Sequence, residues 1–122
     1  MQYSANKASA TGAHSVGGIA GAIYDKSTII SCYNAGNIRT TTSGSNNANY
    51  LAGGIVGYMS SGGVSTNVIT ISNCYNTGSV YGYSATSGIT ALQESAGRYY
   101  LNNNYTVRNT NRKRQIWYII TL

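Results

Sequence analysis

Charged side chains are scarce in this sequence. They make up 8% of its residues, against about a quarter in an average soluble domain. Proline and phenylalanine are absent, whereas tyrosine occurs 12 times and glycine 15 times. Such a chain cannot rely on surface charge for its solubility and must use Asn, Ser, Thr and Tyr instead. This surface chemistry is typical of secreted and cell-surface β-proteins, so we expect an extracellular or cell-surface location.

The side chains that catalysis usually requires are also few. The only acids are Asp25 and Glu94, and the only histidine is His14. A triad of His14, Asp25 and a serine such as Ser15 has nothing in the sequence to bring its members together. Glycoside hydrolysis generally needs two carboxyl groups across the scissile bond, and the two acids lie two repeats apart, so we do not expect them to be adjacent. We therefore predict no enzyme activity and no catalytic residue.

The sequence also lacks the composition of a metal or cofactor site. A zinc site needs four ligands, usually in close pairs. This sequence contains only two cysteines and one histidine. The glycine blocks lack the Walker lysine and a following helix, so they are not phosphate loops. We predict no metal and no cofactor.

No long apolar run is present. The longest one, Ile116 to Leu122, is far too short to span a bilayer, so we expect no membrane span. The first residues are not followed by the apolar core of a signal peptide. If the protein is secreted, we expect this chain to be a piece of a longer precursor.

What the sequence does contain is an internal repeat. A Gly-Gly-Ile-x-Gly block is followed by a strand-like segment ending in Cys-Tyr-Asn-x-Gly, and both recur with a period of roughly 35 residues. The first copy is Gly17–Gly21 with Ile29–Ile38, the second is Gly53–Gly57 with Ile71–Val80, and a diverged third copy is Ser87–Ala91 with Leu101–Thr106. Repeats of this size form stacked units that bury a shared core only as neighbours.

The pattern of each repeat predicts three short strands separated by turns. In the second repeat these are Gly54–Tyr58, Val68–Ser72 and Ser79–Tyr83, with Asn, Ser and Gly between them. The segment Ala91–Gly97 tolerates at most one helical turn. We predict an all-β fold, a right-handed parallel β-solenoid (β-helix) of about three coils with a C-terminal capping strand.

Stacking of the coils predicts columns of equivalent residues. Three columns are expected: Ile29, Ile71 and Leu101 pointing inward; Tyr33, Tyr75 and Tyr105; and Asn73 with Asn103. The predicted inward set is Ile19, Ile55, Ile29, Ile71, Cys32, Cys74, Ile38 and Val80.

Two further predictions follow from the same alignment. Cys32 and Cys74 occupy equivalent repeat positions, and in-register neighbours on parallel strands are poorly oriented for a disulfide, so we expect free, buried thiols. Asn104 heads a glycosylation sequon, Asn-Tyr-Thr, but it occupies the cysteine position of the third repeat. We therefore expect Asn104 to be buried.

The chain divides into three parts. Residues 1–15 form a partial preceding coil, residues 16–107 are the solenoid repeats, and residues 108–122 are a basic and apolar tail. We expect the tail to cap the open end of the solenoid; the alternatives are a docking strand that gives an oligomer and an incidental segment without a structural role. Truncation after Asn111 would distinguish the three. Insertions at Thr40–Ala52 and Ser60–Asn67 are expected as loops on one face.

The repeat resembles the GLUG repeat. Gly18-Ile19-Ala20-Gly21 and Gly54-Ile55-Val56-Gly57 match its name motif, and Gly88-Ile89-Thr90-Ala91 departs at the last glycine. The resemblance implies large bacterial surface proteins, including adhesin-like proteins and immunoglobulin A-cleaving metallopeptidases, in which the repeat is an accessory stalk or binding region. The zinc motif of the peptidase, His-Glu-x-x-His, is absent from this sequence, so that activity does not carry over.

These observations lead to a functional prediction with two alternatives. We expect a non-catalytic module of a bacterial surface or secreted protein that serves as scaffold or adhesive unit for a host glycan, a host protein or neighbouring repeats. The alternatives are a fragment of a polysaccharide-active β-helix enzyme and a binder of anionic surfaces or nucleic acid, although a nucleic-acid partner is not expected. The predicted contact residues are Tyr50, Tyr58, Tyr81 and Tyr83, and the predicted anion contacts are Arg108, Arg112, Lys113 and Arg114.

Overall fold

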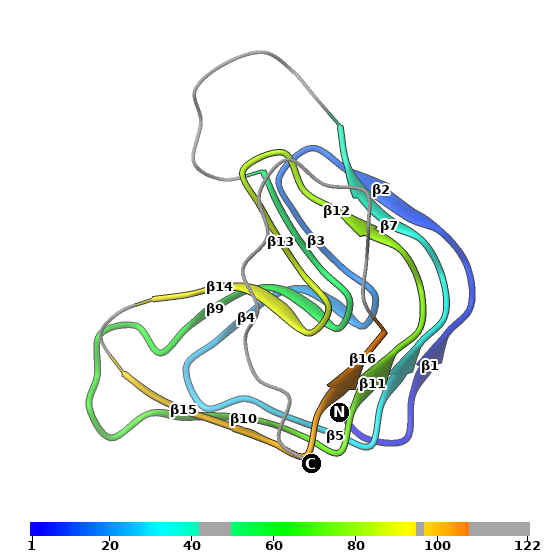
Figure 1. The fold of residues 1–122 in the computed structure, drawn as a ribbon. Coiled ribbons are helices and arrows are strands. Elements are labelled where there is room, and N and C mark those ends of the chain that lie inside the picture. The colour runs from blue at the N-terminus through cyan, green and yellow to red at the C-terminus, as the bar shows by residue number, and fades with distance from the viewer. Residues whose placement is uncertain (42–49, 95–96, 108–122) are drawn as a thin grey trace.

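The computed structural model describes residues 1–41, 50–94 and 97–107. These residues form short strands and no helix, and the chain winds through three coils of five strands each (Figure 1). The first coil contains β1 (Ala5–Asn6), β2 (Ala10–Gly12), β3 (Ser15–Gly17), β4 (Ala20–Tyr24) and β5 (Thr28–Ile30). The second contains β6 (Tyr33–Asn34), β7 (Ile38–Thr40), β8 (Leu51–Gly53), β9 (Val56–Ser60) and β10 (Val68–Ser72). The third contains β11 (Tyr75–Asn76), β12 (Val80–Tyr81), β13 (Ala85–Ser87), β14 (Thr90–Gln93) and β15 (Arg98–Asn102), after which β16 (Tyr105–Thr106) follows.

Equivalent strands of successive coils pair side by side into five parallel sheets. In chain order these are sheet 1 (β1-β6-β11-β16), sheet 2 (β2-β7-β12), sheet 3 (β3-β8-β13), sheet 4 (β4-β9-β14) and sheet 5 (β5-β10-β15). Every strand pair is parallel. The predicted all-β parallel β-solenoid is confirmed. The prediction of three strands per coil was wrong, because each coil has five. Strands of two or three residues, such as β11 and β8, are too short to show an alternating pattern in the sequence.

The register confirms the predicted columns. Ile71 pairs with Ile29 on one side and Leu101 on the other, and Tyr75 pairs with Tyr33 and Tyr105 in the same way. Asn73 and Asn103 both have a φ of 53° at the corner between sheets 5 and 1. Asparagine is the non-glycine residue that best tolerates this left-handed conformation, which explains its recurrence there.

The core fills the interior of the coils. Seven of the eight residues predicted to point inward are buried, and Ile55, Ile71 and Val80 are fully inaccessible. Ile19 is the exception, because it is only partly buried while packing against the main cluster. It belongs to the first coil, which has a neighbouring coil on one side only within the described residues.

A second interior column is polar and was not predicted. Asn34 and Asn76 are fully buried behind sheet 1. Asn6 Nδ2 donates to Asn34 Oδ1 at 2.8 Å, Asn34 Nδ2 donates to Asn76 Oδ1 at 2.6 Å, and Asn76 Nδ2 donates to Thr106 Oγ1 at 3.3 Å. Each amide also bonds the backbone two residues on; for Asn76 both bonds go to Gly78. This asparagine ladder therefore ties all coils together through hydrogen bonds.

Glycines make room for the asparagine ladder on the opposite wall. A Cβ on Gly18 would overlap Asn34 Cγ, and a Cβ on Gly54 would lie 2.7 Å from Asn76 Nδ2 and overlap the Gly88 carbonyl oxygen. Real Cβ atoms do not approach so closely. The Gly-Gly-Ile-x-Gly block and the Cys-Tyr-Asn segment are thus two halves of one packing contact.

The cysteines are free and buried, as predicted. Cys74 Sγ lies 3.4 Å from the backbone nitrogen of Cys32, which donates to it, and 3.2 Å from the Ser72 carbonyl oxygen. Burial raises the pKa of the Cys74 thiol to about 11. Asn104 replaces the cysteine in the third coil and is buried too, since its Oδ1 accepts from the Cys74 nitrogen at 3.0 Å. A glycan on this side chain would not fit in the interior.

Three further expectations need correction or stay open. The segment expected to allow a helical turn contains strand β14. Of the insertions, Ser60–Asn67 lies between β9 and β10 (Figure 1), whereas residues 42–49, most of the first insertion, lie outside the described residues, so their expected position on one face stays a prediction. The tail, residues 108–122, lies outside the described residues, so the cap and the docking strand remain predictions. Within the described part of the chain, no helix is long and apolar enough to cross a membrane.

A candidate binding groove on the outside of the solenoid

A groove of about 500 Å³ lies where sheets 3 and 4 meet. Its lining comes from all three coils and consists of His14, Ser15, Tyr24, Leu51, Tyr58 and Leu92. Figure 1 shows the two sheets diverging from a shared corner, with β13 and β14 as the strands of the third coil. Residues far apart in the sequence are thus brought together by the stacking of equivalent strands.

The groove is on the outer side of this corner. On β8, Ala52 packs with Ile38 and Val80 in the interior. Because successive side chains of a strand point to opposite faces, the preceding Leu51 points outward. Leu51 forms a separate small cluster with Ala85 and Ala91, against which Tyr58 and Leu92 pack. The floor of the groove is therefore apolar although it belongs to the outer surface.

Aromatic rings line the groove on both sides, Tyr24 and Tyr58 on the sheet 4 side and His14 on the sheet 3 side. On the sheet 4 side, the rings of Tyr24 and Tyr58 meet edge to face with centroids 6.0 Å apart. On the sheet 3 side, His14 stacks on Tyr50 with centroids 5.9 Å apart, and Tyr50 meets Tyr83 edge to face. Tyr24 is 57% exposed, so its ring is accessible to a ligand.

The predicted tyrosine contacts fall into different environments. Tyr58 lines the groove, while Tyr81 and Tyr83 are half-buried outside it. Tyr50 is only 4% exposed, so the expectation that it presents an outward contact surface was wrong. Its ring is covered by its neighbours because it stacks on His14 and meets Tyr83 edge to face. The four predicted anion contacts, Arg108, Arg112, Lys113 and Arg114, lie outside the described residues.

The two acids lie at one corner of the solenoid. The Asp25 nitrogen donates to the Ser60 carbonyl oxygen at 2.9 Å, and Ser60 Oγ donates to Glu94 Oε2. Asp25 follows β4, Ser60 ends β9 and Glu94 follows β14, so the acids flank the second coil at one corner. Two strand spacings, about 9.6 Å, lie between their coils, so the two acids share a corner without being adjacent, in agreement with the expectation from the sequence.

Metal binding finds no support at this corner. Within residues 1–41, 50–94 and 97–107, no group of three or more His, Cys, Asp or Glu side chains is arranged to hold a metal ion.

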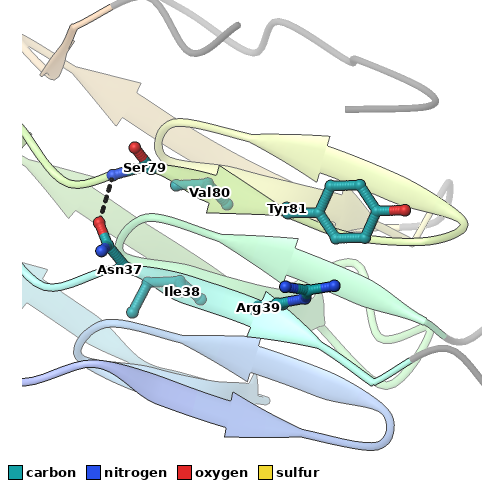
Figure 2. Close-up of a pocket in the computed structure, with 6 residues that line it drawn as sticks. All are labelled: Asn37, Ile38, Arg39, Ser79, Val80 and Tyr81. Carbon is teal, nitrogen blue, oxygen red and sulfur yellow. Dashed lines mark hydrogen bonds between the residues drawn. The ribbon is translucent and has the colours of Figure 1, made fainter. Parts of the chain in front are cut away.

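A second hollow of about 470 Å³ lies over sheet 2. It is lined by Asn37, Ile38, Arg39, Ser79, Val80 and Tyr81 (Figure 2). Arg39 Cζ lies 5.3 Å from the centroid of the Tyr81 ring, and the Ser79 nitrogen donates to Asn37 Oδ1 at 3.3 Å. Its described lining carries one cation, which already contacts an aromatic face.

One accessible aromatic surface was not among the predicted contact residues. The column of Tyr33, Tyr75 and Tyr105 runs along the outside of sheet 1, with Tyr75 43% and Tyr105 48% exposed. The rings of Tyr33 and Tyr75 stack at 4.4 Å. The alignment of the repeats predicted this column, and the alternation of β6 and β11, with Asn34 and Asn76 inside, places it outward.

The family comparison matches one coil of this structure. A family model described as the GLUG motif matches residues 12–39. The chain carries a GLUG motif. The motif runs from the end of β2 to β7 and includes both Gly18 and Asn34, the two halves of the first glycine–asparagine contact. The resemblance read from the sequence is confirmed for this segment. Comparisons with curated proteins and with solved structures give no match.

The GLUG motif can now be described physically. Each coil repeats its glycine block and the segment after it, and the parallel register places the copies in columns. The chain is therefore a module of stacked repeats. Across the interior, Gly18 faces Asn34 and Gly54 faces Asn76. In the third coil, Gly88 faces Thr106 instead of an asparagine.

Proposed function

We propose that this chain is a non-catalytic repeat module of a larger bacterial cell-surface or secreted protein, and that it acts as a scaffold and adhesive binding unit. The observation that carries the proposal is the continuous stack of coils, with an apolar and amide-filled interior and two ligand-sized hollows on its outside. Solenoids of this kind provide extended surfaces for binding.

The interior supports the scaffold role. The buried amides of Asn34 and Asn76 bond to each other, to Thr106 and to the backbone. Satisfied buried polar networks rigidify a core and specify one arrangement. A chain locked in this way holds its outer residues at fixed spacings, which is what a spacer or a binding surface requires.

The outer surface supports the adhesive role. Tyrosine combines a large apolar ring with a polar hydroxyl, and it is enriched at recognition surfaces for this reason. Tyr24, Tyr75, Tyr100 and Tyr105 are each more than 40% exposed. These rings, rather than the acids or the histidine, are the recurrent accessible feature of the described surface.

One observation favours a second candidate, a polysaccharide-active enzyme. Asp25 and Glu94 share the corner at Ser60, and inverting glycosidases hold their carboxyl groups about 6.5–9.5 Å apart. Asp25 is exposed at the strand end, away from the apolar floor of the groove. The non-catalytic proposal is preferred because neither acid is among the described residues that line the two hollows.

A binding screen tests the proposal. The full chain is applied to a glycan array and to immobilised extracellular proteins, and DNA binding is titrated with salt. We expect retention on a glycan or protein with little dependence on salt. Release of reducing sugar from a polysaccharide, abolished by Asp25→Asn or Glu94→Gln, would establish the enzyme instead. DNA binding that falls steeply with salt would indicate the anionic-surface binder.

A further inference from the structure

We infer that the groove between sheets 3 and 4 binds a short neutral saccharide. This inference rests on the proposed adhesive function and assigns it a site and a ligand class. The groove combines an apolar floor, aromatic walls and a polar rim, and each of these matches one part of a pyranose ring.

The aromatic and apolar surfaces match the C–H face of a sugar. Tyr24 and Tyr58 meet edge to face, so the two rings present surfaces in different directions on one wall. Leu51 and Leu92 provide the floor between the sheets. A pyranose buries its axial hydrogens against such surfaces while its hydroxyls remain at the rim, and the rings supply large contact area with few rotatable bonds.

The polar groups around this surface match sugar hydroxyls. His14 and Ser15 line the sheet 3 side and can donate or accept hydrogen bonds. The phenol groups of Tyr24 and Tyr58 can do the same. Small-molecule sites are commonly built in this way, from mainly apolar walls with a few polar groups that fix orientation.

Charge and size narrow the ligand class. Among the described residues, no lysine, arginine, aspartate or glutamate lines the groove, so its described lining offers no charged side chain to pair with a charged ligand. The volume of about 500 Å³ is within the usual range for small-molecule pockets and admits about two or three pyranose rings. A neutral di- or trisaccharide therefore fits better than a charged glycan.

The other two outer features fit this ligand less well. In the column on sheet 1, the facing surfaces of Tyr33 and Tyr75 are stacked on each other and are not free for a sugar. In the hollow over sheet 2, the Tyr81 ring is already in contact with Arg39. Of these aromatic sites, the groove alone has an apolar floor beside an accessible ring.

The test is a titration of the ¹⁵N-labelled full chain with neutral trisaccharides: maltotriose, cellotriose, mannotriose and N-acetylated chitotriose. We expect at least one of them to shift the amide signals of His14, Ser15, Tyr24 and Tyr58. Tyr24→Ala and Tyr58→Ala should each weaken binding about tenfold, a loss of about 1.4 kcal/mol. The matched control is Tyr100→Ala, which removes a 51% exposed tyrosine from sheet 5 and should change affinity less than about twofold.

The outcomes separate this inference from the proposed function. Tyr24 is exposed, so Tyr24→Ala should fold even if Tyr58→Ala does not; thermal unfolding checks both. The groove assignment would be overturned if both variants bound the trisaccharide with unchanged affinity, or if the amide shifts were centred on Tyr75 and Tyr105. The adhesive function would still stand in either case. Failure of all four trisaccharides while the chain retains a protein ligand would overturn the saccharide inference alone. Failure of every glycan and protein probe would overturn both.

Discussion

Two interior columns of this solenoid both stack equivalent residues of successive coils, but different interactions hold them together. Behind sheet 5, Ile29, Ile71 and Leu101 stack through apolar contact. Behind sheet 1, Asn34 and Asn76 stack through amide hydrogen bonds. The apolar column accepts a leucine in place of isoleucine, because dispersion contacts require volume and little direction. The amide column requires a donor and an acceptor at fixed positions, so it specifies the register of the coils as well as filling space.

The largest effect should come from the glycine that faces the amide column. In Gly54→Ala the new Cβ would overlap a backbone carbonyl and press on Asn76. We expect a loss of more than about 4 kcal/mol in the free energy of unfolding, or no folded protein. Gly63→Ala is the control: nothing lies within 4 Å of its Cβ position, and its φ of +71° alone should cost about 1 kcal/mol. Urea denaturation followed by circular dichroism measures both. Equal stability of the two variants would contradict the glycine–asparagine contact.

Removal of an amide from the ladder should be nearly as damaging. Asn76→Ala leaves the Asn34 amide and the Gly78 nitrogen without their acceptor in the fully buried interior. We expect a loss of about 3 kcal/mol, since unsatisfied buried donors are costly. Asn102→Ala, at an exposed position, serves as control and should fall within about 0.5 kcal/mol of the parent. A small loss at Asn76 would show that water replaces the amide.

The buried thiol between these columns gives a pH signature. The pKa of Cys74 is raised by burial from 9.0 to about 11, so the folded state retains the proton longer than the unfolded state. Its contribution to stability is complete below pH 9 and is lost as the pH rises towards 11, by about 2 kcal/mol. Tyrosines also ionise in this window, so the measurement is the difference between the parent and Cys74→Ala. A thiol reagent should label the native parent only as fast as it unfolds. Prompt labelling, or identical pH profiles, would contradict burial of this thiol.

The smallest effect is expected in the apolar column. Ile71→Val removes one methyl group from a fully buried side chain and should cost about 1 kcal/mol. The outward neighbour on the same strand gives the control, because Thr70→Val changes a half-buried position and should cost less. The comparison of the columns would fail if Ile71→Val were as harmful as Asn76→Ala under the same denaturation conditions.

The sequence allowed the columns to be predicted but not the full coil. Ile71 and Tyr75 could be aligned with their counterparts because the repeats have identical or similar residues at those positions. The short strands were missed because two or three residues carry no alternation. Asn76 was interpreted as a turn residue, because Asn-x-Gly is a turn signal whether its amide points to water or to the core.

The candidate groove was harder to predict for a different reason. Its lining brings together Ser15, Leu51 and Leu92, which belong to no common sequence motif. Only the register of sheets 3 and 4 brings them together, and that register depends on insertions of unequal length in each coil. The shared corner of Asp25 and Glu94 was missed likewise, since distance along a chain says little about position around a solenoid.

The glycine–asparagine contact bears on how such a chain can grow in evolution. Gly18 and Asn34 lie within the same GLUG motif, residues 12–39, and Gly54 and Asn76 follow the same order in the next coil. A gene segment with these limits carries both the space and the side chain that fills it. Duplication or deletion of that segment would add or remove a complete coil and leave each remaining asparagine facing a glycine. A breakpoint between the glycine and the asparagine would place the amide opposite a residue that leaves no room for it. We therefore expect duplicated segments that fold to begin before the glycine and to end after the asparagine.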